Sequence, residues 1–238
     1  MSLWRRITDT PSEPMRYSAI RHPMTRMLQV AFTLLGTDVT WLELVAFALA
    51  LACVVCNTLE IHWGWPLAIA SSGLYGWLFF ASRLYGDVAV QGYFVVSSAW
   101  GWWEWLFGRR RVSAGDSSSG GDASLRVARM PPRARFAIAA LWLAMWPLAG
   151  VLLGRFTNTD VPYFDAFPTA GSFIGQALLG LKYVESWPVW ILVNIVGAAL
   201  YAYKSLDLTA LLYAVFAVLS VVGWRRWSLA PALGGAAR

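Results

Sequence analysis

The chain has 238 residues, of which 58% are hydrophobic and only 13% are charged. A soluble domain carries about 25% charged residues, so this composition excludes an ordinary water-soluble fold and predicts a membrane protein. The formal net charge of +6 does not indicate nucleic-acid binding, because arginines outside membrane spans set topology and contact anionic lipid.

Tryptophan is unusually frequent, with 15 residues, and most of them lie where apolar runs begin or end. This placement is typical of the aromatic belt that anchors helices at the headgroups of a bilayer. We therefore expect a multi-pass protein of the cell (inner) membrane, in contact with lipid.

The N-terminal segment, residues 1–40, contains no evident cleavable signal sequence, because no apolar core follows its basic start directly. Its one apolar run, residues 27–36, is too short to cross a bilayer and predicts an interfacial helix.

Membrane spans are the main predicted elements. A hydrocarbon core roughly 30 Å thick needs about 20 apolar residues in a helix, and seven stretches of the chain meet this requirement. They run approximately over residues 41–57, 65–85, 88–107, 136–154, 162–181, 187–203 and 208–224. The predicted fold class is therefore an all-α membrane protein with seven transmembrane helices.

The two cysteines, Cys53 and Cys56, lie in the apolar run LACVVC of the first stretch. This spacing occurs in redox motifs, but no thioredoxin-like context surrounds it here. We interpret both as packing residues, because buried cysteine usually behaves as a small hydrophobe.

Residues 108–135 form a basic Gly/Ser/Arg-rich loop without apolar periodicity, which predicts a mobile linker. This loop supplies seven of the eleven Lys and Arg residues on its side of the membrane, against eight on the other side. The positive-inside tendency then places the linker and the C-terminal tail, residues 228–238, in the cytoplasm, although five arginines in the N-terminal segment oppose this orientation.

An internal repeat appears when the chain is shifted against itself by 122 positions. Each half then contains Trp-Pro, followed 36 residues later by G-W-x-x-W. The matched residues are Trp41 with Tyr163, Glu43 with Asp165, Trp65-Pro66 with Trp187-Pro188, and Gly101-Trp102 and Trp105 with Gly223-Trp224 and Trp227.

The repeat covers residues 41–107 and 162–227 and leaves the stretch 136–154 unpaired. Three helices cross the membrane an odd number of times, so a second copy joined directly to the first would have the opposite orientation in the membrane. The extra helix over residues 136–154 gives both copies the same orientation. The predicted architecture is thus two parallel three-helix bundles joined by a linker helix, a plan that transporters use. Duplicated bundles also occur in membrane enzymes and receptors, so transport is the favoured reading rather than the only one.

The sixth stretch carries the strongest candidate site. Trp187, Trp190, Asn194, Gly197 and Tyr201 share one helix face, within an arc of about 80°. Indole faces stack on a planar heterocycle while an amide fixes polar substituents, so this strip suits a flat ring that carries hydroxyls. The alternatives are that the tryptophans belong to the interfacial belt and that the amide joins helices.

The first half offers fewer candidates. Gln91, Phe94, Ser98 and Trp102 share a face of the third stretch, and Asn57 ends the first stretch. Because Asn194 and Trp190 align with Ser72 and Ala68, the second half is expected to supply most of the contacts to a ring, with Gln91, Ser98 and Asn57 added from the first.

Ionisable groups are placed only in loops or near the ends of the stretches, and this includes His22 and His62. Proton relays need such groups at mid-membrane, so we expect passive movement of a solute, with sodium coupling left open. The sequence shows no P-loop, HExxH or nucleophile elbow, so it predicts no enzyme, no metal site and no cofactor.

Several runs resemble the Pnu vitamin transporters, most closely the PnuC nicotinamide riboside type. They are WLELVAFAL from residue 41, WGWPLAIASSGLYGWLFF from 63, LYGDVAVQGYF from 84, GWWEW from 101, KYVESWPVWILVNIVGAALYAYK from 182 and LTALLYAVFAVLSVVGW from 208. The resemblance covers nearly all of residues 41–227 except the basic loop. It implies a SWEET-like 3+1+3 fold, a homotrimer, and energy-independent uptake of a vitamin that a kinase then traps inside the cell.

The family's W-x-x-W-x-x-x-N pattern, which holds nicotinamide riboside in such proteins, falls on Trp187, Trp190 and Asn194, and its glutamine falls on Gln91. The chain departs from the family at Phe94, where a tyrosine is frequent, and at Ala68, where a glycine is frequent. Sister families carry thiamine or riboflavin, so another ringed vitamin remains an alternative substrate. A receptor or assembly subunit without transport is the alternative of another class.

Overall fold

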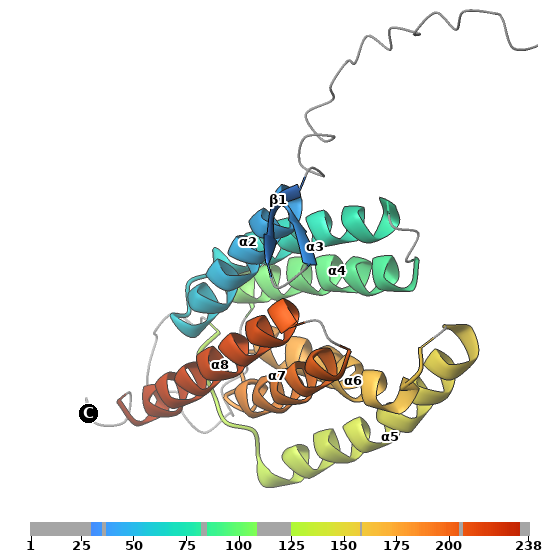
Figure 1. Cartoon of the computed structure of the whole chain (residues 1–238). Coiled ribbons are helices and arrows are strands. Elements are labelled where there is room, and N and C mark those ends of the chain that lie inside the picture. Colours follow the sequence, from blue (N-terminus) through green and yellow to red (C-terminus); the bar gives the residue numbers. More distant parts are fainter. Residues whose placement is uncertain are drawn as a thin grey trace, which may run out of the picture.

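Seven helices and one short β-hairpin make up the computed structural model of the chain, which describes residues 30–34, 37–81, 85–108, 125–157, 159–204 and 207–233 (Figure 1). The helices are α2 (Trp41–Thr58), α3 (Gly64–Ala81), α4 (Tyr85–Phe107), α5 (Pro132–Phe156), α6 (Pro162–Gly180), α7 (Ser186–Tyr203) and α8 (Asp207–Leu233). The all-helical fold class predicted from hydropathy is confirmed, and the helices coincide with the seven apolar stretches.

The helices form two sets of three, as the blue-to-green and orange-to-red ribbons of Figure 1 show. In each set, α2–α4 and α6–α8, consecutive helices pack against one another. The sets meet where α2 contacts α8 and α4 contacts α6, while α5 packs on α6 at the edge of the molecule.

Within the described part of the chain, three helical segments are long and apolar enough to cross a bilayer by length and composition: Pro132–Phe156, Ser186–Tyr203 and Thr209–Leu229. Helix α5 turns large apolar side chains outward, with Phe136 77% exposed and Phe156 80% exposed. Apolar surface of this extent requires lipid or protein around it, which fits a multi-pass membrane protein.

The loops after α2 and after α6 have the same backbone geometry. Glu60 and Lys182, which are 122 positions apart, adopt positive φ angles of 58° and 53°. The Ile61 and Tyr183 N–H groups donate to the Cys56 and Leu178 carbonyls at 2.8 and 3.0 Å, which ends each helix in the same way. The structure therefore repeats itself with the offset that the sequence predicted.

Near the N-terminus the predicted interfacial helix over residues 27–36 is wrong for the part that the structure describes. Residues Val30–Leu34 (β1) pair antiparallel with Thr37–Thr40 (β2), and residues 1–29 lie outside the described residues. Short apolar runs do not distinguish helix from strand by period, and the Val and Thr residues here favour a strand.

The predicted mobile linker over residues 108–135 differs from the structure at residues 125–135, and residues 109–124 lie outside the described residues. Residues 125–131 are packed, and α5 already begins at Pro132. Leu125 and Met130 are buried, and Ala128 forms a parallel bridge with Tyr183. Similarly, α8 continues to Leu233, so the predicted C-terminal tail begins as helix.

Candidate functional site

A cavity of about 250 Å³ lies between the two sets of helices. Its size is slightly below the range of about 300 to 1,000 Å³ that is usual for ligand pockets. Every helix except α5 contributes to its wall. The polar lining residues are Asn57, Ser71, Ser72, Gln91, Ser98, Gln176, Asn194 and Ser220, and the aromatic ones are Tyr75, Phe94, Trp187, Trp190 and Phe216.

The structure brings together six of the seven residues that the sequence nominated for a site. They are Asn57 on α2, Gln91 and Ser98 on α4, and Trp187, Trp190 and Asn194 on α7. Asn57 and Ser98 are buried. Trp187 and Asn194 are buried as well, so the nominated face of α7 is turned inward at these two positions and not toward lipid.

Tyr201 is the nominated residue that does not line the cavity. It lies seven residues after Asn194, about 10 Å farther along the helix, and its ring lies 4.9 Å from that of Tyr213. The side chain of Tyr213 also fills the space beside Gly197, which the sequence analysis had left open for a solute. Helical phase therefore placed Tyr201 on the correct face but not at the correct depth.

Two amide groups in the wall are each anchored by a serine. The Gln176 amide nitrogen donates to Ser98 Oγ at 3.1 Å, and the Asn194 amide nitrogen donates to Ser220 Oγ at 3.3 Å. Ser98 and Ser220 are 122 positions apart, so the repeat places one hydroxyl acceptor in each half. These bonds fix the orientation of both amides within the cavity.

Several buried polar atoms beside the cavity have no hydrogen-bond partner among the described residues. They are the indole nitrogens of Trp187 and Trp190 and the side-chain oxygen of Asn57. A buried donor or acceptor without a partner costs about 1 to 3 kcal/mol. A solute with hydroxyl groups would satisfy both kinds, because indole donates and the amide oxygen accepts.

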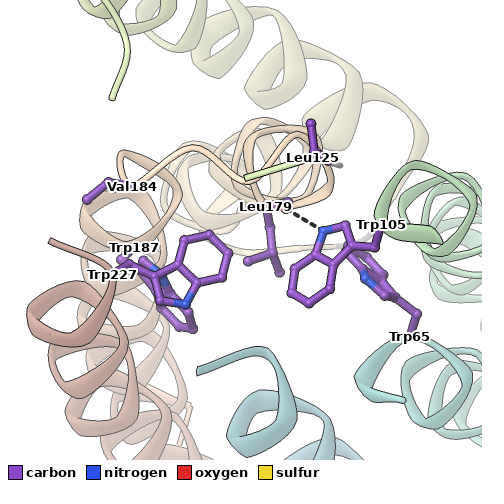
Figure 2. Packing of buried hydrophobic residues seen from close by; sticks show 7 residues of the cluster. All are labelled: Trp65, Trp105, Leu125, Leu179, Val184, Trp187 and Trp227. Atoms are coloured by element: carbon purple, nitrogen blue, oxygen red, sulfur yellow. Dashed lines mark hydrogen bonds between the residues drawn. The ribbon is translucent and has the colours of Figure 1, made fainter. Parts of the chain in front are cut away.

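A cluster of tryptophans lies at the end of the cavity where α2, α4 and α6 end, and it shares Trp187 with the cavity wall (Figure 2). Trp65 meets Trp105 edge-on at 5.4 Å, and Trp187 meets Trp227 edge-on at the same distance. Trp105 and Trp227 lie 6.0 Å apart and join the two pairs. The Trp105 indole N–H donates to the Leu179 carbonyl at 3.2 Å, which ties α4 to α6.

The sequence analysis missed Gln176, Ser220, Phe216 and Tyr75 in the wall. Gln176 is an uncharged amide in the middle of an apolar stretch, and the argument applied to Asn194 would have found it. Ser220 could have been predicted as well, because the repeat aligns it with Ser98, which the sequence analysis nominated. No periodic signal singled out Phe216 or Tyr75, because aromatic residues are frequent throughout the chain.

The described wall of the cavity is uncharged. Among the described residues that line the cavity there is no Asp, Glu, Lys, Arg or His. Within the same described part of the chain, no group of three or more His, Cys, Asp or Glu side chains could hold a metal ion. Neutral donors, acceptors and aromatic faces thus define the chemistry of the cavity.

Comparison with known proteins identifies the family. The model of the nicotinamide mononucleotide transporter family matches residues 40–229. The chain is 23% identical over 221 residues to the nicotinamide riboside transporter PnuC of Escherichia coli (strain K12), which covers 81% of this chain and 87% of that protein. It is 26% identical over 201 residues to the riboflavin/roseoflavin transporter RibM of Streptomyces davaonensis, covering 84% of this chain and 90% of RibM.

The fold is shared with a solved transporter. The crystal structure of the vitamin B3 transporter PnuC superposes with a TM-score of 0.62 at 22% identity, over 79% of this chain and 80% of that one. These findings confirm the resemblance to the Pnu transporters and favour transport over a receptor or an enzyme. The chain belongs to the nicotinamide mononucleotide transporter family and is a multi-pass membrane transporter.

Proposed function

We propose that this transporter facilitates the uptake of nicotinamide riboside by alternating access around the cavity. The observation that carries the proposal is the wall formed by Trp187, Trp190 and Asn194 of α7. Nicotinamide riboside combines a flat cationic pyridinium ring with a ribose. Indole faces bind such a ring with a cation–π contribution of about 0.5 to 2 kcal/mol, and amides bind its polar groups.

The remaining wall supports a role for the first set of helices in holding the polar groups of the substrate. Asn57, Gln91 and Ser98 of the first set stand around the cavity with the α7 residues, and Gln176 of α6 in the second set joins them. Amide and hydroxyl groups both donate and accept, as a carboxamide and ribose hydroxyls require.

Movement without ion coupling is the second part of the proposal. The described lining residues carry no ionisable group of the kind that proton-coupled transporters place at mid-membrane. The substrate is itself cationic, and in the cell the membrane potential would favour its entry.

The proposed architecture is the SWEET-like 3+1+3 plan, with bundles over residues 41–107 and 162–227 and a linker helix over 136–154. The paired tryptophans and the matching loops at Glu60 and Lys182 support it. The resemblance to the Pnu transporters supports a homotrimer in the inner membrane, and the basic loop supports a cytoplasmic linker.

Riboflavin is a second candidate substrate, because the RibM relative is named as a riboflavin transporter and is 26% identical to this chain. A competition panel with nicotinamide riboside, riboflavin and thiamine on the purified protein distinguishes these substrates. Nicotinamide riboside should displace a labelled tracer at the lowest concentration.

Counterflow in proteoliposomes tests the proposal. Vesicles preloaded with unlabelled nicotinamide riboside should accumulate the labelled compound without any ion gradient, and Asn194→Ala should abolish most of this uptake. Counterflow of riboflavin alone would support the second candidate. A strict requirement for sodium or a proton gradient would contradict passive movement.

A further inference from the structure

Glu60 and Lys182 occupy the same position in the two halves of the chain and contact each other. Each is the residue of positive φ in its loop, after α2 and after α6 respectively. Lys182 Nζ lies 4.0 Å from Glu60 Oε2. A residue and its repeat equivalent come together in this way only near the axis that relates the two halves, so this ion pair joins the two sets of helices.

The ion pair lies beside the tryptophan cluster at one end of the cavity. Lys182 Nζ stands 4.6 Å from the centroid of the Trp105 ring. Trp187 and Leu179 belong both to this cluster and to the cavity wall. Proceeding outward from the cavity, the order is therefore Trp187, the other tryptophans, and then the charged pair.

Residues 125–131, which we call the strap, hold Lys182 in place. The Ala128 N–H donates to the Lys182 carbonyl, and the Val184 N–H donates to the Ala128 carbonyl, both at 3.0 Å. The Met130 N–H donates to Glu185, which also pairs with Arg135 at 2.9 Å. Leu125 is buried in the tryptophan cluster at the near end of the strap (Figure 2).

We propose that Glu60 and Lys182 form a gate pair, which holds the two sets of helices together while the cavity is closed on the linker side. Opening on that side must separate the pair and the Trp105–Trp227 contact, since both join the two sets. The inference rests on the alternating access proposed above, but not on the identity of the substrate.

Removal of Glu60 and removal of Lys182 are expected to destabilise the closed gate by different amounts. The Lys182 side chain is 12% exposed, whereas that of Glu60 is 35% exposed. Burial lowers the pKa of the Lys182 ammonium below its ordinary value, and the Glu60 carboxylate partly offsets this effect. Removal of Glu60 thus leaves a desolvated charge without its partner, which is costly, whereas removal of Lys182 leaves a carboxylate that water still reaches.

The native cysteines provide the test. Cys53 lines the cavity, so in a Cys56→Ala background its modification reports access to the cavity. A charged, membrane-impermeant methanethiosulfonate reagent is applied to one side of oriented vesicles without substrate. Glu60→Gln should raise the rate of Cys53 modification from the linker side about two- to fivefold, the effect expected of a partly exposed ion pair. Lys182→Gln should also raise the rate, but by less. In the double variant the two increases should not multiply, because the same ion pair is lost only once.

The matched control is Lys204→Gln, because Lys204 pairs with Asp165 at 2.8 Å within the second set of helices and at the opposite end of α7. It should leave the rate from the linker side unchanged. A general loss of structure would raise modification from both sides, whereas an open gate raises it from the linker side only. An unchanged rate in Glu60→Gln, an equal rise from both sides, or increases that multiply in the double variant would overturn the proposal.

Discussion

Trp187 lies edge-on to Trp227 with ring centroids 5.4 Å apart and planes at 86°, and the side of its ring covers Gly223. The same arrangement recurs 122 positions earlier, where Trp65 covers Gly101 and meets Trp105 at 85°. The Trp-Pro and G-W-x-x-W signatures of the sequence are thus the two partners of one packing unit. Glycine is needed in each unit because the indole occupies the position of a side chain.

A test of this packing unit is Gly101→Ala. The added Cβ would lie 2.5 Å from the Trp65 ring, which is 0% exposed and has no free space to move into. Overpacking of this kind costs about 1 to 3 kcal/mol, so the thermal unfolding midpoint in detergent should fall. Gly92→Ala in the same helix is the control, because nothing lies within 4 Å of its Cβ and alanine favours the helix. Equal midpoints for the two variants would contradict the packing unit.

Two substitutions of Trp190 separate the contribution of its aromatic ring to substrate binding from that of its indole N–H group. Its indole nitrogen is buried without a partner among the described residues, so a bound solute is expected to accept its hydrogen bond. Trp190→Phe should weaken substrate binding about two- to tenfold, the worth of one hydrogen bond, and Trp190→Ala should weaken it further by removing the stacking face. Isothermal titration of the purified variants measures both steps. Wild-type affinity in Trp190→Ala would exclude this residue from the site.

Gln176 is expected to act as one unit with Ser98, which accepts its amide hydrogen bond. Gln176→Ala should reduce substrate affinity about two- to tenfold, through the loss of one oriented polar contact. If Ser98 acts by holding the amide, Ser98→Ala should add little in the Gln176→Ala background, although it weakens binding on its own. Strictly additive losses in this double-mutant cycle would show that the two side chains contact the substrate independently.

Tyr201, unlike Trp190 and Gln176, is expected not to contact the substrate. It was nominated from the helical phase of α7, yet its ring packs near Tyr213 and does not line the cavity. Tyr201→Phe keeps this packing and should leave substrate affinity within about twofold of the wild type. A tenfold loss of affinity in the same titration would mean that the cavity extends to Tyr201 in another state of the transporter.

Hydropathy and the repeat predicted most of the fold, because seven apolar stretches and one fixed offset constrain the order of the helices strongly. They failed at residues 30–34, 37–40 and 125–131, where pairing with another segment decides the structure. Met130, for example, is buried because the strap forms hydrogen bonds with Glu185 and with the α6–α7 loop. No local sequence pattern encodes that contact.

The site was predictable to the extent that helical phase determines which side chains face inward. Phase placed Trp187, Trp190 and Asn194 on one face, and the structure sets them around one cavity. Depth along the helix and the aromatic contribution from α8 depend on how helices pack, so Phe216 was missed and Tyr201 was included.

The most direct measurement of the central claim is a density map of the purified protein with nicotinamide riboside bound. We predict density for the pyridinium ring against Trp187 and Trp190, with the polar groups of the ligand beside Asn194 and Gln91. Density for the ligand at any place outside the cavity between the two sets of helices would contradict the account.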